Sequence, residues 1–180
     1  MSAPDAKPSA ESVAPAVEPW LRGTNQDVPA VGRAVLHALQ LAGEDLRKWC
    51  ASLSDAALNA RPAGIAPVAF HIRHIARSLD RLLTYAESRD LNESQLAALR
   101  RELDPGAKRD ELFAELAAAL ANGATRVRAL ATANLEEPRT VGKKQLPTTV
   151  GGLLVHVADH TQRHVGQAIT TAKIVTGNNQ

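Results

Sequence analysis

Apolar residues recur every three or four positions along four long stretches of the chain, which is the spacing of helices with one buried face. Segments that contain proline or glycine separate these stretches. The pattern therefore predicts four long helices, over about 29–53, 67–88, 108–133 and 150–176. We expect Asp27 to cap the first of them, and Thr148 or Thr149 to cap the last.

Three shorter segments complete the predicted organisation. Asn92 and Gln95 have the spacing of a capping arrangement, which predicts a short helix over about 93–103. Residues 138–147 begin and end with proline and are expected to form an extended connection. Residues 1–19 hold four prolines among small and acidic residues, so we expect a disordered tail before a single domain over 20–180. The sequence thus predicts an all-α fold, a four-helix bundle with a short extra helix.

Composition narrows the classes of protein that remain. Aromatic residues make up only 3% of the chain, which disfavours an all-β sandwich or barrel. The net charge of +2 is too small for a nucleic-acid-binding surface, and no apolar run is long enough to span a membrane. The N-terminus does not resemble a secretory signal, so we expect a cytoplasmic protein. The single cysteine, Cys50, rules out an internal disulfide and is expected to be a buried, inert thiol.

Six histidines are the unusual feature of the chain, and five of them fall into two short clusters. The sixth, His37, lies about 200° around its predicted helix from Val35 on the apolar stripe, so we expect it to be exposed. The two clusters lie on the second and last long helices. Any chemistry of the protein is therefore expected to involve these two helices.

The last helix carries His156, His160 and His164 at about −40°, 0° and +40° around its axis, within the apolar face. Three imidazoles buried together are costly unless their nitrogens are satisfied, and a metal ion satisfies them well. The outer two are about 12 Å apart along the axis, too far to share one ion. One ion would therefore take His160 with either His156 or His164.

A further ligand must come from another helix, and the second long helix offers His71 and His74. These two residues are about 60° apart around the axis, and both lie near the inward stripe. Helix geometry alone therefore does not choose between them.

Two segments resemble the DinB/YfiT-like superfamily of bacterial four-helix-bundle proteins: residues 70–81, FHIRHIARSLDR, and residues 156–167, HVADHTQRHVGQ. The resemblance covers about residues 29–176. In that family, one histidine of the second helix and a His-x-x-x-His pair of the last helix bind a divalent metal. The resemblance implies that His74, His160 and His164 are the ligands here. Four neighbours are candidate hydrogen-bond partners of the ligands or substrate contacts, although ordinary packing would also explain them: His71, His156, Gln167 and Ser78.

Three neutral imidazoles accept zinc, nickel, iron or manganese and leave an open position, where a bound water or thiol loses its proton more readily. Thr161 stands where a metalloprotease would carry its general-base glutamate, which disfavours protease chemistry. The resemblance implies thiol-dependent transferases and isomerases that use a low-molecular-weight thiol, and proteins that are often homodimers.

The leading hypothesis is a metal-dependent enzyme, a thiol S-transferase or a hydrolase, that acts on a small molecule through metal-bound thiolate or water. The alternative is a non-catalytic metal-binding module in which the ion is structural or sensory. DNA binding finds no support in the charge pattern.

Overall fold

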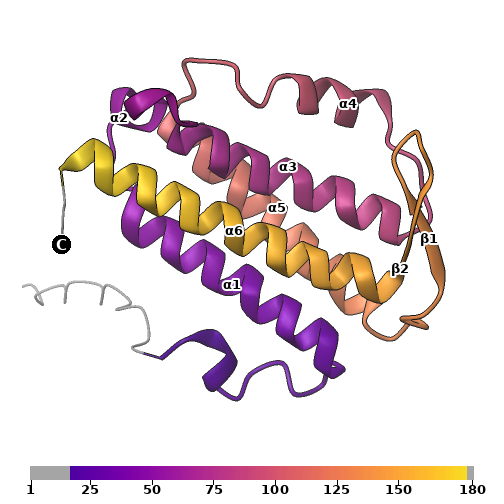
Figure 1. The fold of residues 1–180 in the computed structure, drawn as a ribbon. Helices are drawn as coiled ribbons and strands as arrows, with labels where there is room; N and C mark the ends of the chain where they lie inside the picture. The colour runs from indigo at the N-terminus through magenta and orange to yellow at the C-terminus, as the bar shows by residue number, and fades with distance from the viewer. Residues whose placement is uncertain (1–16, 178–180) are drawn as a thin grey trace, which may run out of the picture.

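Four long helices dominate the computed structural model, which describes residues 17–177 (Figure 1). They are α1 (Ala30–Cys50), α3 (Val68–Ala86), α5 (Arg109–Leu130) and α6 (Val150–Thr176). Helices α1 and α3 each pack against both α5 and α6. The prediction of four long helices is confirmed. Most of the predicted tail, residues 1–16, lies outside the described residues, and Pro19–Leu21 form a short 3-10 turn, η1.

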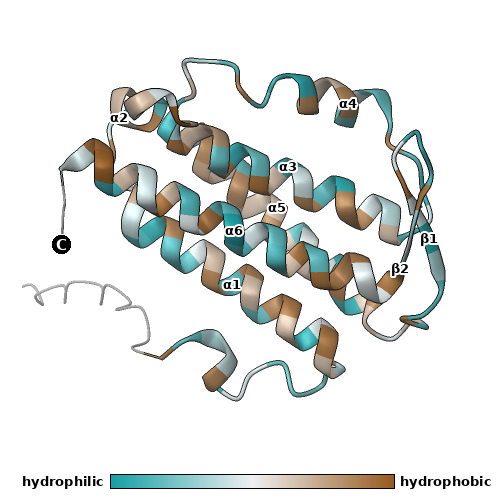
Figure 2. Ribbon diagram, in the orientation of Figure 1, coloured by the Kyte–Doolittle hydropathy of each residue, from teal (hydrophilic) through white to brown (hydrophobic). Residues whose placement is uncertain are grey.

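Apolar side chains from all four long helices fill the space between them, and the outward faces are polar, as the alternating colours along each helix in Figure 2 show. Leu46, Ile72 and Ile75 are fully buried in one half of this core, and Val35, Leu79 and Leu154 are almost fully buried in the other. Burial of each such side chain contributes about 1.5–3 kcal/mol to stability. This core fixes the register of α3 against α6, and with it the relative positions of their histidines.

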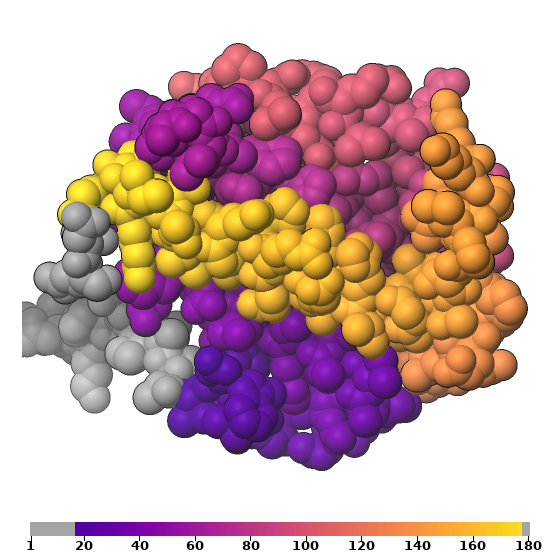
Figure 3. All heavy atoms as spheres, viewed as in Figure 1, coloured from indigo at the N-terminus to yellow at the C-terminus, as the bar shows by residue number. Residues whose placement is uncertain are grey.

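Helix α4 (Glu93–Arg100) and the loop after it lie along α3 and cover one side of it (Figure 3). The predicted capping box is confirmed. The Asn92 side chain accepts a hydrogen bond from the Gln95 backbone N–H at 2.9 Å, and the Gln95 side chain accepts one from the Asn92 N–H at 3.0 Å. The helix ends three residues before the predicted boundary, so residues 101–104 form a loop next to α3.

A small two-stranded sheet and a one-turn helix were not predicted. Strands β1 (Pro138–Val141) and β2 (Leu146–Thr149) form an antiparallel hairpin in which Pro138 pairs with Thr149 and Val141 with Leu146. Residues 138–147 were expected to be only an extended connection. The predicted all-α class is therefore too narrow, because this segment contributes to two paired strands. Helix α2 (Asp55–Asn59) follows a Ser54 cap. Thr149 caps α6 through its side chain, one of the two predicted alternatives.

The start of α1 differs from the prediction in its capping residue. Pro29 is the N-cap residue, and no side chain caps the helix. Asp27 instead accepts a hydrogen bond from Arg128 on α5 at 3.1 Å. The prediction that Asp27 caps this helix is therefore wrong, because its carboxylate has a partner on another helix.

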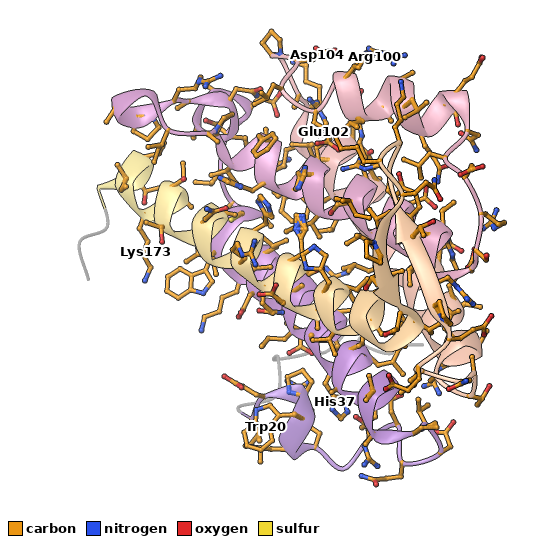
Figure 4. The ribbon with its side chains drawn as sticks, turned by 45° about the vertical axis from the view of Figure 1, so that its right-hand side comes forward. Trp20, His37, Arg100, Glu102, Asp104 and Lys173 are labelled. Carbon is orange, nitrogen blue, oxygen red and sulfur yellow. The ribbon has the colours of Figure 1, made fainter. Side chains whose placement is uncertain are left out.

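The prediction that His37 is exposed is also wrong: only 7% of the residue is accessible to solvent. The segment before α1 folds back over the face of the helix that carries His37, as Figure 4 shows from the neighbouring positions of His37 and Trp20. Its Nε2 lies 3.1 Å from the Thr24 hydroxyl. Arg22 holds the segment in place by two hydrogen bonds to Glu44 on α1. The apolar period of a helix shows which face packs on the core. It does not show that a segment outside the helix covers the opposite face.

Cys50 is buried at the end of α1, as predicted, and its burial raises the pKa of the thiol to about 12. It is therefore an unreactive thiol at neutral pH. Within residues 17–177, none of the helices combines the length and the apolar character that crossing a membrane requires.

Candidate metal centre

Three histidines from two helices converge between α3 and α6. His74 comes from α3, and His160 and His164 come from successive turns of α6. One nitrogen of each ring lies within 4.8 Å of one nitrogen of each of the other two. We call these residues the three-histidine cluster. The structure thus brings together the three residues that the resemblance implied as ligands.

The spacing within the three-histidine cluster fits a shared ion. The Nε2 atoms of His74 and His160 are 3.1 Å apart, and the ring centroid of His164 lies 4.4 Å from that of His74 and 4.7 Å from that of His160. Two nitrogens that each bind one ion at about 2.1 Å, with an angle of about 90–110° between the bonds, are about 3.0–3.4 Å apart. The observed separation therefore matches two neighbouring positions in one coordination sphere.

His160 and His164 also have the protonation state that a metal requires. Burial, reinforced by the neighbouring histidines, lowers the pKa of His160 to about 4 and that of His164 to about 3. Burial similarly lowers the pKa of His71 to about 4. At neutral pH these rings are uncharged and keep a lone pair on one nitrogen, which is the form that coordinates metal ions.

The ring nitrogens that face away from the cluster have two different kinds of surroundings. The Nδ1 of His74 lies 2.6 Å from Glu102 Oε2, and the Nδ1 of His164 lies 3.0 Å from the Nδ1 of His71. The Nδ1 of His160 is buried and, among the described residues, has no hydrogen-bond partner. With its Nδ1 bonded to Glu102, His74 directs its Nε2 to the space between the three rings, where it faces the Nε2 of His160.

Glu102 is the residue of this centre that sequence reasoning missed. It lies on the loop after α4, beside α3 (Figure 4), and its carboxylate also accepts a hydrogen bond from Arg81 at 2.6 Å. Burial acts to raise the pKa of Glu102, but the hydrogen bonds from His74 and Arg81 outweigh it and lower the pKa. No pattern in the sequence relates a loop residue to a histidine 28 positions earlier, so nothing in the chain could have indicated the contact.

The remaining candidates take different positions around the cluster. His71 is buried and contacts His164, as described above. The His156 side chain is 46% exposed, and its ring stacks on that of His160 rather than converging with the cluster. Ser78 is buried and donates a hydrogen bond to the Ile75 carbonyl of its own helix, which is ordinary packing. Gln167 is exposed on α6, where it lines a cavity.

That cavity has a volume of about 440 Å³ and lies between α6 and the segment before α3. His71 and Gln167 line it together with Arg163, while Ile65 and Ala66 form an apolar wall. Arg163 also forms a surface pair with Asp159, at 2.8 Å. Because His71 contacts both the cavity and His164, the cavity is one side chain away from the three-histidine cluster.

Fold and site together define a mainly helical protein with a histidine site suited to a metal ion. The sequence profile of the DinB superfamily matches residues 38–168, which is most of the chain. The chain belongs to the DinB superfamily. A comparison with curated proteins found no match.

Proposed function

We propose that this chain is a metal-dependent enzyme that acts on a small molecule, with His74, His160 and His164 as the ligands of a divalent ion. The observation that carries the proposal is the convergence of three imidazole nitrogens within 4.8 Å of one another. The low pKa values of His160 and His164 support it, since neutral rings bind metal without first losing a proton.

The charges around the centre favour an ion that is catalytic. His160 and His164 are neutral, and the negative charge of Glu102 is offset by Arg81, 2.6 Å away. A divalent ion held in this way keeps its charge and supplies a Lewis acid that activates a coordinated water or low-molecular-weight thiol. Zinc, nickel, iron and manganese all suit such a donor set.

The surrounding residues are suited to binding and orienting a small substrate. The cavity next to the cluster offers Arg163 to an acidic group and the apolar wall of Ile65 to a short hydrocarbon. His71 lies between this cavity and His164, where its ring can contact a bound molecule. Phe70 stacks on the His74 ring, with centroids 5.2 Å apart, and so covers one face of that ring.

We further infer that the four long helices form the four-helix bundle expected from the resemblance. The contacts of α1 and α3 with both α5 and α6 support this arrangement, in which each long helix has two long neighbours. The short strands of the hairpin lie at the start of α6 and do not interrupt it.

The test starts with metal analysis of the purified protein beside a His74→Ala/His160→Ala variant. We expect stoichiometric divalent metal in the wild type and none in the variant. The cobalt-loaded protein is then titrated with glutathione, mycothiol and bacillithiol, and a change in its visible spectrum reports a thiol at the ion. Screens for thiol conjugation and for hydrolysis of small esters and amides follow. The opposite result is a protein that binds metal but whose cobalt spectrum does not change when a thiol or a small anion is added. That result would favour the structural or sensory module.

A further inference from the structure

Glu102 joins the three-histidine cluster to a buried arginine. One carboxylate oxygen lies 2.6 Å from His74 Nδ1, and the other accepts a hydrogen bond of 2.6 Å from Arg81. The Glu102 side chain is only 6% exposed, and the Arg81 side chain is 11% exposed. A buried carboxylate with two charge-assisted partners is held in one position, because any other position would leave a charge unpaired.

The backbone around Glu102 is fixed by the same helix that carries His74. The Arg73 guanidinium on α3 donates hydrogen bonds to the carbonyls of three residues of the loop, at 2.9–3.3 Å: Arg101, Glu102 and Asp104. One turn later, Arg77 donates to the Ala98 carbonyl at 2.8 Å. Helix α3 therefore holds the segment 98–104 at successive turns, and Glu102 is presented to His74 by a rigid support.

We propose that Glu102 is a positioning residue that keeps the proton of His74 on Nδ1 and directs the Nε2 lone pair into the three-histidine cluster. A carboxylate can only accept at this position, so the Nδ1 must donate. Arg81 holds the carboxylate and offsets its charge. The effect of Glu102 on metal affinity rests on the proposed function. Its control of the His74 tautomer does not.

A purely structural role is the competing explanation, because ion pairs between helices and loops are common in proteins without metal sites. The chain provides a matched control. Arg77, also on α3, forms a 2.7 Å pair with Glu115 of α5, and no histidine is part of that pair. Replacement of Glu115 by Gln removes a carboxylate from an arginine of the same helix without changing any partner of His74.

The first experiment measures zinc affinity by competition with a chelator in Glu102→Gln, Glu102→Leu/Arg81→Met and Glu115→Gln. The double variant replaces both charges with apolar groups of similar volume, so that neither is left buried and unpaired. We expect it to lower zinc affinity by about 10–100-fold, the usual effect of losing the hydrogen-bond partner of a metal-binding histidine. Glu102→Gln keeps an oxygen acceptor and should lose less, and Glu115→Gln should match the wild type.

The second experiment determines the His74 tautomer in the metal-free protein by long-range ¹H–¹⁵N NMR. The wild type and Glu115→Gln should carry the proton on Nδ1, and Glu102→Leu/Arg81→Met should populate both tautomers. Thermal unfolding of each variant shows that it is folded. An unchanged tautomer in the double variant would overturn the proposal, as would wild-type zinc affinity in that variant.

A wild-type protein that binds neither zinc nor any other divalent ion would overturn the proposed function instead. The tautomer measurement would still decide whether Glu102 orients His74, because it needs no metal. The two proposals can therefore fail separately.

Discussion

Histidines shielded from solvent occur in two regions of this protein: His37 is buried, and the rings of the three-histidine cluster are half-buried. The regions differ in how these rings are satisfied. His37 lies alone under the segment before α1, where the Thr24 hydroxyl is its partner at 3.1 Å. In the three-histidine cluster, by contrast, the Nε2 of His74 lies 3.1 Å from the Nε2 of His160, and the Nδ1 of His160 has no partner among residues 17–177. Burial of a histidine therefore does not by itself indicate a metal site. Convergence of several rings favours a shared ion, because the rings cannot all satisfy one another.

The largest expected effect is that of His160→Ala on metal binding. His160 belongs to both pairs that the last helix could offer, and its Nε2 faces that of His74. Loss of a direct ligand should exceed the roughly 10–100-fold cost of losing an outer hydrogen bond. Metal content after dialysis against a weak chelator measures the effect. A His160→Ala protein that retains stoichiometric metal would place the ion outside the three-histidine cluster.

Next in size is the contrast between His164→Ala and His156→Ala. His164 converges with His74 and His160, whereas the His156 side chain is 46% exposed and its ring stacks on that of His160. The first variant should lose tight metal binding, and the second should keep it. The same dialysis experiment compares the two. Retention by His164→Ala together with loss by His156→Ala would move the site one turn toward the start of α6.

A pH dependence should distinguish the cluster in the metal-free protein. The pKa values of His71 and His160 are lowered to about 4 and that of His164 to about 3, against about 6.5 in an unfolded chain. The unfolded chain therefore binds protons first as the pH falls. The stability due to these neutral rings is complete above pH 6.5 and is lost toward pH 4.

Urea unfolding of the metal-free wild type at several pH values measures this loss. A His160→Gln/His164→Gln variant should show a flatter dependence between about pH 6.5 and 4.5, above the range in which most carboxylates titrate. Equal slopes for the two proteins would show that the cluster rings are not held neutral by the fold.

The smallest expected effect is that of His37→Ala, which should leave metal content unchanged and lower the free energy of unfolding by about 1 kcal/mol, the usual value of one hydrogen bond. Thr24→Val removes the other partner, and the double variant should cost less than the sum of the two single changes. Loss of metal from His37→Ala would remove the distinction between the two regions.

Local patterns account for the parts of the fold that the sequence predicted. The four long helices follow from apolar spacing, and the capping box of α4 follows from Asn92 and Gln95. The hairpin was missed because its strands have only four residues each, too few to show an alternating period. His37 was misplaced because the residues that cover it lie outside the helix whose period was used.

The candidate site was predictable only in part, because some of its contacts also come from segments outside the helices whose periods were used. Helix geometry placed five histidines on two facing helices but left two choices open on each of them. The resemblance to a known family, rather than spacing, selected His74, His160 and His164. Glu102 and Arg81 could not be found, because the contacts of Glu102 with Arg81 and with His74 depend on a loop fixed by tertiary hydrogen bonds.

The most direct test of the central claim is a crystal structure of the zinc-loaded protein with anomalous data collected on both sides of the zinc absorption edge. We predict a single anomalous peak about 2.1 Å from one nitrogen each of His74, His160 and His164. A peak between His156 and His160, or a zinc-loaded crystal with no peak at the three-histidine cluster, would contradict the account.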